Sequence, residues 1–367
     1  MLPERVLMGP GPSDVYPEVL AAMARPTIGH LDPAFIEFMD KLNDSLRQAF
    51  KTENRVTLPI SAPGSAGMEC AFVNLLEPGD KVVVAGNGVF GARMMENARR
   101  CGAIPVEVAF DWGTPVDPGV VEDTLKAHPD AKVLAFVHSE TSTGVRSDAK
   151  TLCELARKHD CLTIVDAVTS LGGIDLQVDE WGIDAIYSGT QKCLSAPPGL
   201  SPVSFNEAAM AKVQSRSTPV QSWFLDLNLL TGYWGPGTKR AYHHTAPINS
   251  LYALGAALDI LHREGIENSW ARHARNHEKL RDGLLAMGLE LFVEEAYRLP
   301  QLNAVNVPEG VDEAAVRSFL LNEHNLEIGA GLGTMAGKIW RIGLMGASCS
   351  ERHVELCLQG LSEALAQ

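Results

Sequence analysis

The chain has 367 residues, of which 46% are hydrophobic and 21% charged, with a formal net charge of −14 at pH 7. This length and apolar content predict two domains, or one large domain with a smaller appendage, and a core that needs neither disulfides nor metals. The acidic balance argues against nucleic acid or an anionic membrane as partner, because binding to phosphate backbones requires clustered Lys and Arg.

Seven cysteines lie in apolar or helical contexts without a C-x-x-C pair, and we expect them to be reduced core thiols. The first residues do not have the pattern of a signal peptide, and no window approaches the roughly 18 apolar residues of a membrane span. The last residues, Ala-Leu-Ala-Gln, are not a peroxisomal address. The sequence therefore predicts a soluble, cytoplasmic protein.

Short apolar strands alternate with amphipathic helices through the first two thirds of the chain. Residues 33–50 have helical spacing, and a strand is expected over 57–60. The clearest later strands are Lys81–Ala85, Ile104–Phe110, Val133–His138, Leu162–Asp166 and Ala185–Ser188. The clearest helices are Ala66–Leu76, Phe90–Arg100, Gly119–His128 and Asp148–His159. This alternation predicts an α/β fold with a mainly parallel sheet covered on both faces.

The pattern changes at about Ser250, where helices near 250–264 and 267–287 are followed by strands near 302–307 and 338–344. A helix at 312–324 separates these strands, and a last helix covers 350–366. This part predicts a smaller α+β domain.

Two residues at predicted strand ends carry the chemistry. Asp166 ends an apolar strand, and Lys192 follows another strand among small residues and prolines. Alone, such an Asp is more often a helix cap and such a Lys is usually solvated. Together they match pyridoxal 5′-phosphate (PLP), which requires an amine for a Schiff base and a carboxylate at its pyridine nitrogen.

Two further segments fit this cofactor and its substrates. The turn Ser61–Gly67 lies between a strand and a helix, and offers backbone N–H groups and a favourable dipole to a phosphate. Arg341 interrupts an apolar strand, where its guanidinium suits a substrate carboxylate, although a salt-bridged or edge-exposed Arg is an equally good interpretation.

With these residues in place, the chain resembles the class V, fold type I PLP-dependent aminotransferases of the alanine–glyoxylate and serine–glyoxylate (serine–pyruvate) type. The resemblance runs nearly from end to end. Its landmarks are Gly9-Pro-Gly-Pro-Ser13, Asn87-Gly-Val-Phe90-Gly, Glu140-Thr-Ser-Thr-Gly144, Asp166-Ala-Val-Thr-Ser-Leu-Gly-Gly173, Tyr187-Ser-Gly-Thr-Gln-Lys192, Tyr242-His-His-Thr245, Glu267-Asn-Ser-Trp270 and Arg341-Ile-Gly-Leu.

The resemblance implies two catalytic residues and a ping-pong transamination from alanine or serine to glyoxylate or pyruvate. Lys192 corresponds to the lysine that forms the internal aldimine and then moves the substrate proton, and Asp166 to the residue paired with the pyridinium nitrogen. Arg341 is implied as the carboxylate-binding residue, with Gly11 and Thr141 also near the substrate.

The resemblance also implies the remaining cofactor contacts. Phe90 takes the place of an aromatic residue, usually Trp, that stacks on the cofactor, and Thr141 faces its phenolic oxygen. The residues that correspond to the family's phosphate contacts are Gly64, Ser65, Ala66 and Gln191. In the family this turn often reads Gly-Ser-Gly-His, whereas the chain reads Ala62-Pro-Gly-Ser65, which puts details of phosphate binding in doubt.

Tyr242 and Thr245 match residues that, in the family, reach the cofactor of the neighbouring subunit, which implies a homodimer with composite active sites. The resemblance also implies a fold type I division of the chain. Residues 1–20 are expected to cross to the partner, 21–250 to form a large domain with a seven-stranded type of sheet, and 251–367 to form the small domain.

Alternative functions remain. Within the family, aminoethylphosphonate or ureidoglycine could be the amino donor, because the residues that read the far end of the substrate are not evident. A cysteine desulfurase would need a reactive thiolate, for which Cys349 is the nearest candidate, and a non-catalytic PLP-binding subunit is a further alternative. His273 and His277 have i, i+4 spacing, but we expect a solvated helix face there and no metal site.

Overall fold

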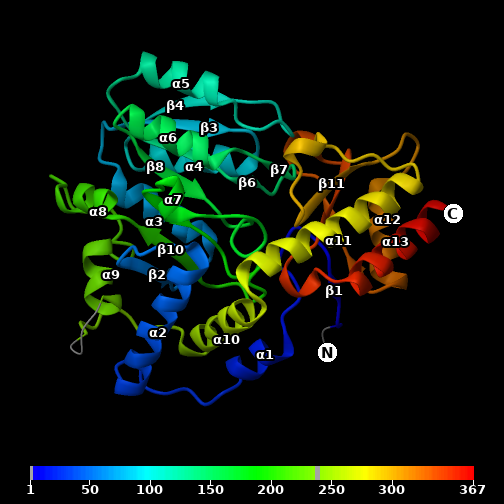
Figure 1. Cartoon of the computed structure of the whole chain (residues 1–367), viewed down its shortest axis with the longest axis horizontal. Coiled ribbons are helices and arrows are strands. Elements are labelled where there is room, and N and C mark those ends of the chain that lie inside the picture. Colours follow the sequence, from blue (N-terminus) through cyan, green and yellow to red (C-terminus); the bar gives the residue numbers. More distant parts are fainter. Residues whose placement is uncertain (1–2, 236–239) are drawn as a thin grey trace.

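A seven-stranded sheet forms the centre of the larger part of the molecule (Figure 1). The computed structural model describes residues 3–235 and 240–367. In spatial order the strands are β2 (Val56–Ile60), β10 (Ser201–Phe205), β9 (Ala185–Tyr187), β8 (Leu162–Asp166), β5 (Ala131–Val137), β3 (Lys81–Gly86) and β4 (Ile104–Ala109). Only β10 runs antiparallel to its neighbours. The predicted α/β fold with a mainly parallel seven-stranded sheet is confirmed.

Helices cover both faces of this sheet. The connections run through α3 (Gly64–Leu75), α4 (Val89–Arg100), α5 (Pro118–Ala127) and α6 (Ala149–Lys158). The chain moves in one direction across the sheet from β2 to β3 and on to β4, and then turns back through β5 to β8. With right-handed crossovers, α3 and α4 therefore lie on one face, and α5 and α6 on the other.

The inner strands are apolar on both sides because both faces are covered. In β3, all side chains from Val82 to Ala85 are fully buried. A parallel sheet between two helical layers has no face in contact with water, so its strands are continuous apolar runs rather than alternating ones. These runs are the signal that made the strands predictable.

A smaller three-stranded sheet with its own core follows toward the C-terminus (Figure 1). Its strands lie in the order β11 (Leu302–Asn306), β14 (Ile339–Gly343), β13 (Gly329–Ala330). The helices that pack with it are α11 (Ile266–Ala286), α12 (Glu313–Glu323) and α13 (Glu351–Leu365). Trp340, which is fully buried, lies in this second core.

The remaining elements are short or peripheral, apart from α2 and α10. They are α1 (Pro17–Met23), α2 (Pro33–Phe50), β6 (Ser139–Glu140), β7 (Val145–Arg146), α7 (Val178–Trp181), α8 (Glu207–Gln214), α9 (Leu227–Trp234), α10 (Ile248–Glu264) and β12 (Leu326–Glu327), with 3-10 turns at Glu295–Tyr297, Gly333–Met335 and Gly346–Ser348.

The N-terminal segment packs on its own chain. Strand β1 (Val6–Leu7) pairs in parallel with β12, and Met8 is fully buried in the second core. The sequence did not indicate these contacts, because the segment is short and has no periodic pattern. The prediction that residues 1–20 cross to a partner subunit stays a prediction.

The expectation that His273 and His277 lie on a solvated face of α11 is wrong. His273 is fully buried and His277 nearly so. Nδ1 of His273 donates to the Ser269 carbonyl oxygen (2.7 Å), and Nε2 accepts from the Gly346 N–H (3.1 Å). His277 is hydrogen-bonded to Asn303 (2.6 Å). The two imidazoles therefore join α11 to the strands and turns beneath it.

The described residues contain neither a membrane-spanning helix nor a cluster of metal ligands. No helix there combines the length and apolar composition needed to cross a membrane. Within the same residues, no group of three or more His, Cys, Asp or Glu side chains is arranged to hold a metal ion.

The close approach of α4 to β3 gives a stability prediction. A Cβ on Gly91 would lie 2.6 Å from the Gly86 Cα, so Gly91→Ala forces two backbones apart. We expect it to lower the free energy of unfolding by roughly 1–3 kcal/mol, as for other overpacked positions. Urea denaturation followed by circular dichroism measures the change. Gly29→Ala is the control, since its Cβ would have no neighbour nearer than 3.8 Å, and equal midpoints for both variants would contradict the prediction.

Candidate active site

A cavity of about 180 Å³ lies at the carboxyl ends of β8 and β9, beside the N-terminus of α3. The predicted residues that line it are Gly64, Ser65, Phe90, Asp166, Gln191 and Lys192. Ala66 follows in the first turn of α3, which begins at Gly64 rather than at the predicted Ala66. The structure thus brings together residues from four separate segments, at the edge of the sheet where parallel α/β folds bind ligands.

Asp166 is a buried carboxyl held by two donors. It ends β8 and is 3% exposed. Oδ1 accepts from the Val168 N–H (2.9 Å), and Oδ2 from the Tyr187 hydroxyl (2.8 Å). Burial nevertheless raises the pKa of Asp166 to about 7. A positive charge brought next to this carboxyl would favour its ionised form.

Lys192 lies in the loop that joins β9 to β10. It is 8% exposed, and Nζ donates to the Pro10 carbonyl oxygen. Burial, together with the positive charge of Arg341, lowers the pKa of Lys192 to about 8. A substantial fraction of this amine is therefore neutral near physiological pH, which is the form that acts as a nucleophile.

The N-terminal segment clamps the lysine from one side. The backbone N–H of Ser13 donates to the carbonyl oxygen of Gln191 (2.9 Å). The side-chain hydroxyl of Ser13 donates to the carbonyl oxygen of Lys192 (2.8 Å). Gly11 has φ +108°, and a Cβ at this position would collide with the end of the Lys192 side chain. Gly11 therefore lies against the amine, and only glycine fits there.

The first turn of α3 has the features of an anion site. Pro63 occupies the N-cap position and provides no side-chain cap. The N–H groups of Gly64 and Ser65 lie at the N-terminus of α3, which is the positive end of the helix dipole, where anions are stabilised. The side-chain amide of Gln191 lines the same cavity, and its NH2 group can donate. An anion with several oxygens would accept hydrogen bonds from these N–H donors.

Arg341 lies on β14 of the smaller sheet and is 6% exposed. Nε donates to the Ala330 carbonyl oxygen (2.7 Å) and Nη1 to that of Thr141 (3.2 Å). Burial lowers the pKa of Arg341 to about 10, so the group remains charged at neutral pH. In the described part of the chain no carboxylate pairs with it, which leaves the remaining N–H donors for a ligand.

Thr141 and Arg341 do not line the Lys192 cavity in this chain. The Thr141 hydroxyl lies 2.5 Å from that of Thr169, while its carbonyl orients Arg341. Tyr242 and Thr245 also lie outside the cavity, and Tyr242 is 65% exposed. Their hydroxyls are 3.4 Å apart. Their predicted contact with a partner's cofactor stays a prediction.

Three neighbours of the candidate site residues were not assigned from the sequence. Tyr187 lies opposite Asp166 in the parallel register of β8 and β9. Aligning the ends of these two predicted strands could have indicated this contact. Glu140 is fully buried and accepts from the Phe90 N–H (3.2 Å) and from Ser142, so it fixes the start of α4. Arg93 lies over the Phe90 ring, 4.9 Å from its centroid.

The thiol that a cysteine desulfurase would need is not reactive here. Cys349 is 1% exposed, and burial raises the pKa of its thiol to about 11. It precedes the Ser350 N-cap of α13 rather than lying inside the helix. A buried thiol with a raised pKa is a poor nucleophile.

The chain is similar in sequence and in structure to known aminotransferases. The family model of the class-V aminotransferases matches residues 6–351. Alanine–glyoxylate aminotransferase of Callithrix jacchus is 40% identical, over 99% of this chain and 88% of that protein. (S)-Ureidoglycine–glyoxylate transaminase of Bacillus subtilis (strain 168) is 39% identical, over 99% of this chain and 91% of that protein. The crystal structure of alanine–glyoxylate aminotransferase from Nostoc sp. has a TM-score of 0.97 and 45% identity, covering 100% of this chain and 96% of that chain.

The raised pKa of Asp166 predicts a pH-dependent stability of the cofactor-free protein. The folded chain keeps a proton on this group that the unfolded chain releases above about pH 4, so the free energy of unfolding falls as pH rises toward 7. We expect Asp166→Asn, which cannot ionise, to be more stable than the wild type at pH 8 by up to about 4 kcal/mol. At pH 4.5 the difference should nearly vanish.

Urea denaturation of the two proteins at both pH values measures this effect. Asp111→Asn, at an exposed position, is the control and should show no pH-dependent difference. An equal difference between Asp166→Asn and wild type at pH 4.5 and pH 8 would contradict the assigned titration.

Proposed function

The chain belongs to the class-V aminotransferases, and we propose that it transfers the amino group of alanine or serine to glyoxylate or pyruvate with PLP as cofactor. The observation that carries this proposal is the convergence of Lys192, Asp166 and the first turn of α3 on one cavity, with the charge of Arg341 acting on Lys192. An amine, a carboxyl and an anion site are the groups that this cofactor requires.

The residues fit the cofactor in their chemistry. Lys192 would bind its carbonyl carbon and Asp166 its ring nitrogen, while Gly64, Ser65 and Gln191 would hold its phosphate. Phe90 lines the same cavity and offers an aromatic face to the ring. When bound, PLP supplies an electron sink that stabilises negative charge at the substrate α-carbon.

The chain's own groups then orient the substrate and move one proton. Arg341 binds the substrate carboxylate and so fixes the direction of the bond to the α-hydrogen. Lys192, with its lowered pKa, removes and returns the proton at the α-carbon. Donor and acceptor both carry a carboxylate, so the same Arg341 serves them in turn, and we expect ping-pong kinetics.

We also propose a homodimer with composite active sites. Two aromatic pairs lie in this part of the chain: the ring centroids of His30 and Tyr242 are 5.1 Å apart, and Trp223 stacks on His243 at 4.4 Å. Trp223 is 62% exposed and Tyr242 65%. Exposed aromatic groups of this size are typical of protein interfaces. A partner on this face would place Tyr242 and Thr245 at the subunit boundary.

Ureidoglycine is the second candidate donor. It is favoured by one observation, the nearly full-length similarity to a transaminase named for this substrate. The cofactor and carboxylate contacts proposed above would serve either donor, so the choice depends on groups around the substrate side chain.

Separate half-reactions test the proposed function. The holoenzyme is mixed with alanine, serine or ureidoglycine, and glyoxylate is then added to each mixture. We expect one donor to remove the visible absorbance of the cofactor on Lys192 and glyoxylate to restore it. Lys192→Ala should lack this band and nearly all turnover. A band that no donor removes would contradict the proposal.

Arg341→Lys tests the carboxylate site. Lysine keeps the charge but loses the planar fork, so we expect KM for donor and acceptor to rise roughly ten- to hundredfold, with cofactor binding unchanged. Steady-state kinetics with an absorbance check of cofactor content measures this. Arg100→Lys, on the exposed face of α4, should leave KM unchanged. An unaltered KM for every acid in Arg341→Lys would exclude the assignment.

A further inference from the structure

Tyr187 packs between two strands and a helix at the Lys192 cavity, and the proposed function assigns it no role. It is the last residue of β9, is 1% exposed and lines the cavity. In the sheet it lies opposite Asp166 of β8 on one side and Val203 of β10 on the other. From α3, Gly67 approaches so closely that a Cβ there would lie 3.1 Å from the Tyr187 Cβ. Tyr187 is therefore held by both neighbouring strands and by the helix that packs on them.

The Tyr187 hydroxyl binds one oxygen of the Asp166 carboxyl. It donates to Oδ2 at 2.8 Å, while Oδ1 accepts from the Val168 N–H at 2.9 Å. Because each oxygen has its own donor on a fixed support, rotation of the carboxyl would break both hydrogen bonds. The carboxyl thus has one preferred orientation, and its oxygens keep lone pairs for a further donor.

Tyr187 remains a donor throughout the physiological pH range. Burial and the adjacent Asp166 raise the pKa of Tyr187 well above its usual value, so the hydroxyl keeps its proton. Burial and the charge of Glu140 oppose ionisation of Asp166, whereas the Val168 N–H, the Tyr187 hydroxyl and the positive charge of Lys192 favour it. Loss of the hydroxyl would therefore remove one of the groups that favour the ionised form.

We propose that Tyr187 is a positioning residue that acts through Asp166. Its hydroxyl keeps the carboxyl in one orientation and favours the ionised form, in which the carboxyl can pair with the protonated ring nitrogen of PLP. This inference rests on the proposed function, because it concerns the cofactor that Asp166 would hold. A neutral donor suits this role, since a positively charged group in its place would compete with the ring nitrogen for the carboxylate.

The stability of the cofactor-free chain tests the coupling between the two residues. The pKa of Asp166 is higher in the folded than in the unfolded chain, so the folded state loses stability as pH rises between the two values. Without the Tyr187 hydroxyl this loss continues to a higher pH. We expect Tyr187→Phe to raise the unfolding equilibrium constant, relative to wild type, roughly fivefold more at pH 8.5 than at pH 4.5, because a hydrogen bond to an ionised group is stronger than one to a neutral group. Urea denaturation at both pH values measures this.

Two comparisons isolate the effect. Tyr233→Phe removes another buried tyrosine hydroxyl, which donates to the His30 carbonyl oxygen at 3.1 Å, and should destabilise the chain equally at both pH values. In Asp166→Asn, where the titrating group is absent, adding Tyr187→Phe should also have the same effect at both pH values. Lys192 and Glu140 are present in all these variants, so their own titration cancels in the differences.

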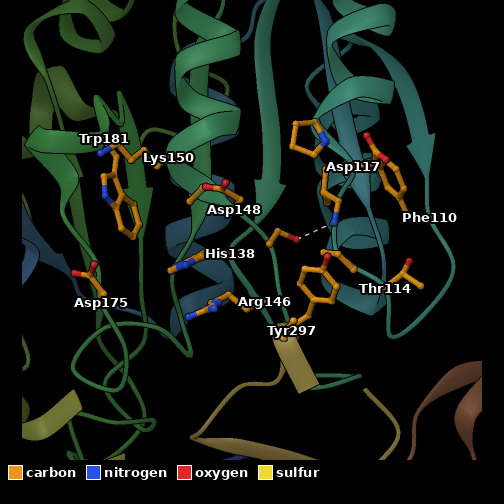
Figure 2. Close-up of a pocket in the computed structure, with 16 residues that line it drawn as sticks. Phe110, Thr114, Asp117, His138, Arg146, Asp148, Lys150, Asp175, Trp181 and Tyr297 are labelled. Carbon is orange, nitrogen blue, oxygen red and sulfur yellow. Dashed lines mark hydrogen bonds between the residues drawn. The ribbon is translucent and has the colours of Figure 1, made fainter. Parts of the chain in front are cut away.

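Cofactor binding extends the test to the holoenzyme. We expect Tyr187→Phe to weaken PLP binding about tenfold and to lower kcat with the donor that reacts, while KM for the carboxylate substrates is unchanged because Arg341 is not altered. Tyr297→Phe is the matched control and should change neither. Figure 2 shows Tyr297 in a separate cavity between the starts of α5 and α6, which shares no lining residue with the Lys192 cavity.

Two results would overturn the proposal. The first is an equal effect of Tyr187→Phe on stability at both pH values, or an equally large pH difference in the Asp166→Asn background, since either would leave Tyr187 as a packing residue only. The second is unchanged PLP affinity together with unchanged kcat in Tyr187→Phe. A wild-type chain that binds no PLP would instead contradict the proposed function, because the stability measurements do not involve the cofactor. Circular dichroism verifies that the variants are folded.

Discussion

The site depends on keeping a carboxyl and an amine out of water without letting them neutralise each other. Asp166 and Lys192 line one cavity, yet the hydrogen-bond partners of each are other groups. Burial disfavours the charged form of both groups, so it raises the pKa of Asp166 and lowers the pKa of Lys192. A ligand that offers a protonated ring nitrogen to one and a carbonyl carbon to the other would relieve both costs. The fold must therefore hold these two groups at fixed, separate positions.

Two features of the backbone provide this separation. The parallel register of β8 and β9 sets Tyr187 opposite Asp166, so the carboxyl is held from the neighbouring strand. The chain then returns at once as antiparallel β10, which needs no crossover helix, and the loop that carries Lys192 is formed by this return. Ser195, in a left-handed conformation at φ 52°, lies 3.1 Å from the Ser13 hydroxyl and accepts from the Ala347 N–H (2.8 Å). The lysine loop is thus tied to the N-terminal segment and to the C-terminal part that also carries Arg341.

The sequence was informative where a local pattern determines structure. Apolar runs such as Val82–Ala85 identified the strands, and the polar residues that end them identified Asp166 and Lys192 as candidates. Strand β10, Ser201–Phe205, was missed because it contains a proline and two serines and is buried only by its neighbours. His273 and His277 were misjudged because the interleaved arginines have the appearance of an exposed face. The link from Thr141 to Arg341 joins distant parts of the chain, and the role proposed for Tyr242 would depend on a second molecule. Neither has a local signal.

The departure of the phosphate turn from the family pattern can be understood in terms of charge. The turn has a proline and a serine where the family often has a serine and a histidine, so this chain brings no imidazole there from α3. An imidazole lies nearby from another segment: Nε2 of His244 is 2.7 Å from the Ser61 hydroxyl. Burial and the adjacent His243 lower the pKa of His244 to about 4, so it is neutral and adds no positive charge. An anion at this turn is then stabilised by the dipole of α3, by the N–H groups of Gly64 and Ser65 and by neutral hydroxyl and amide groups.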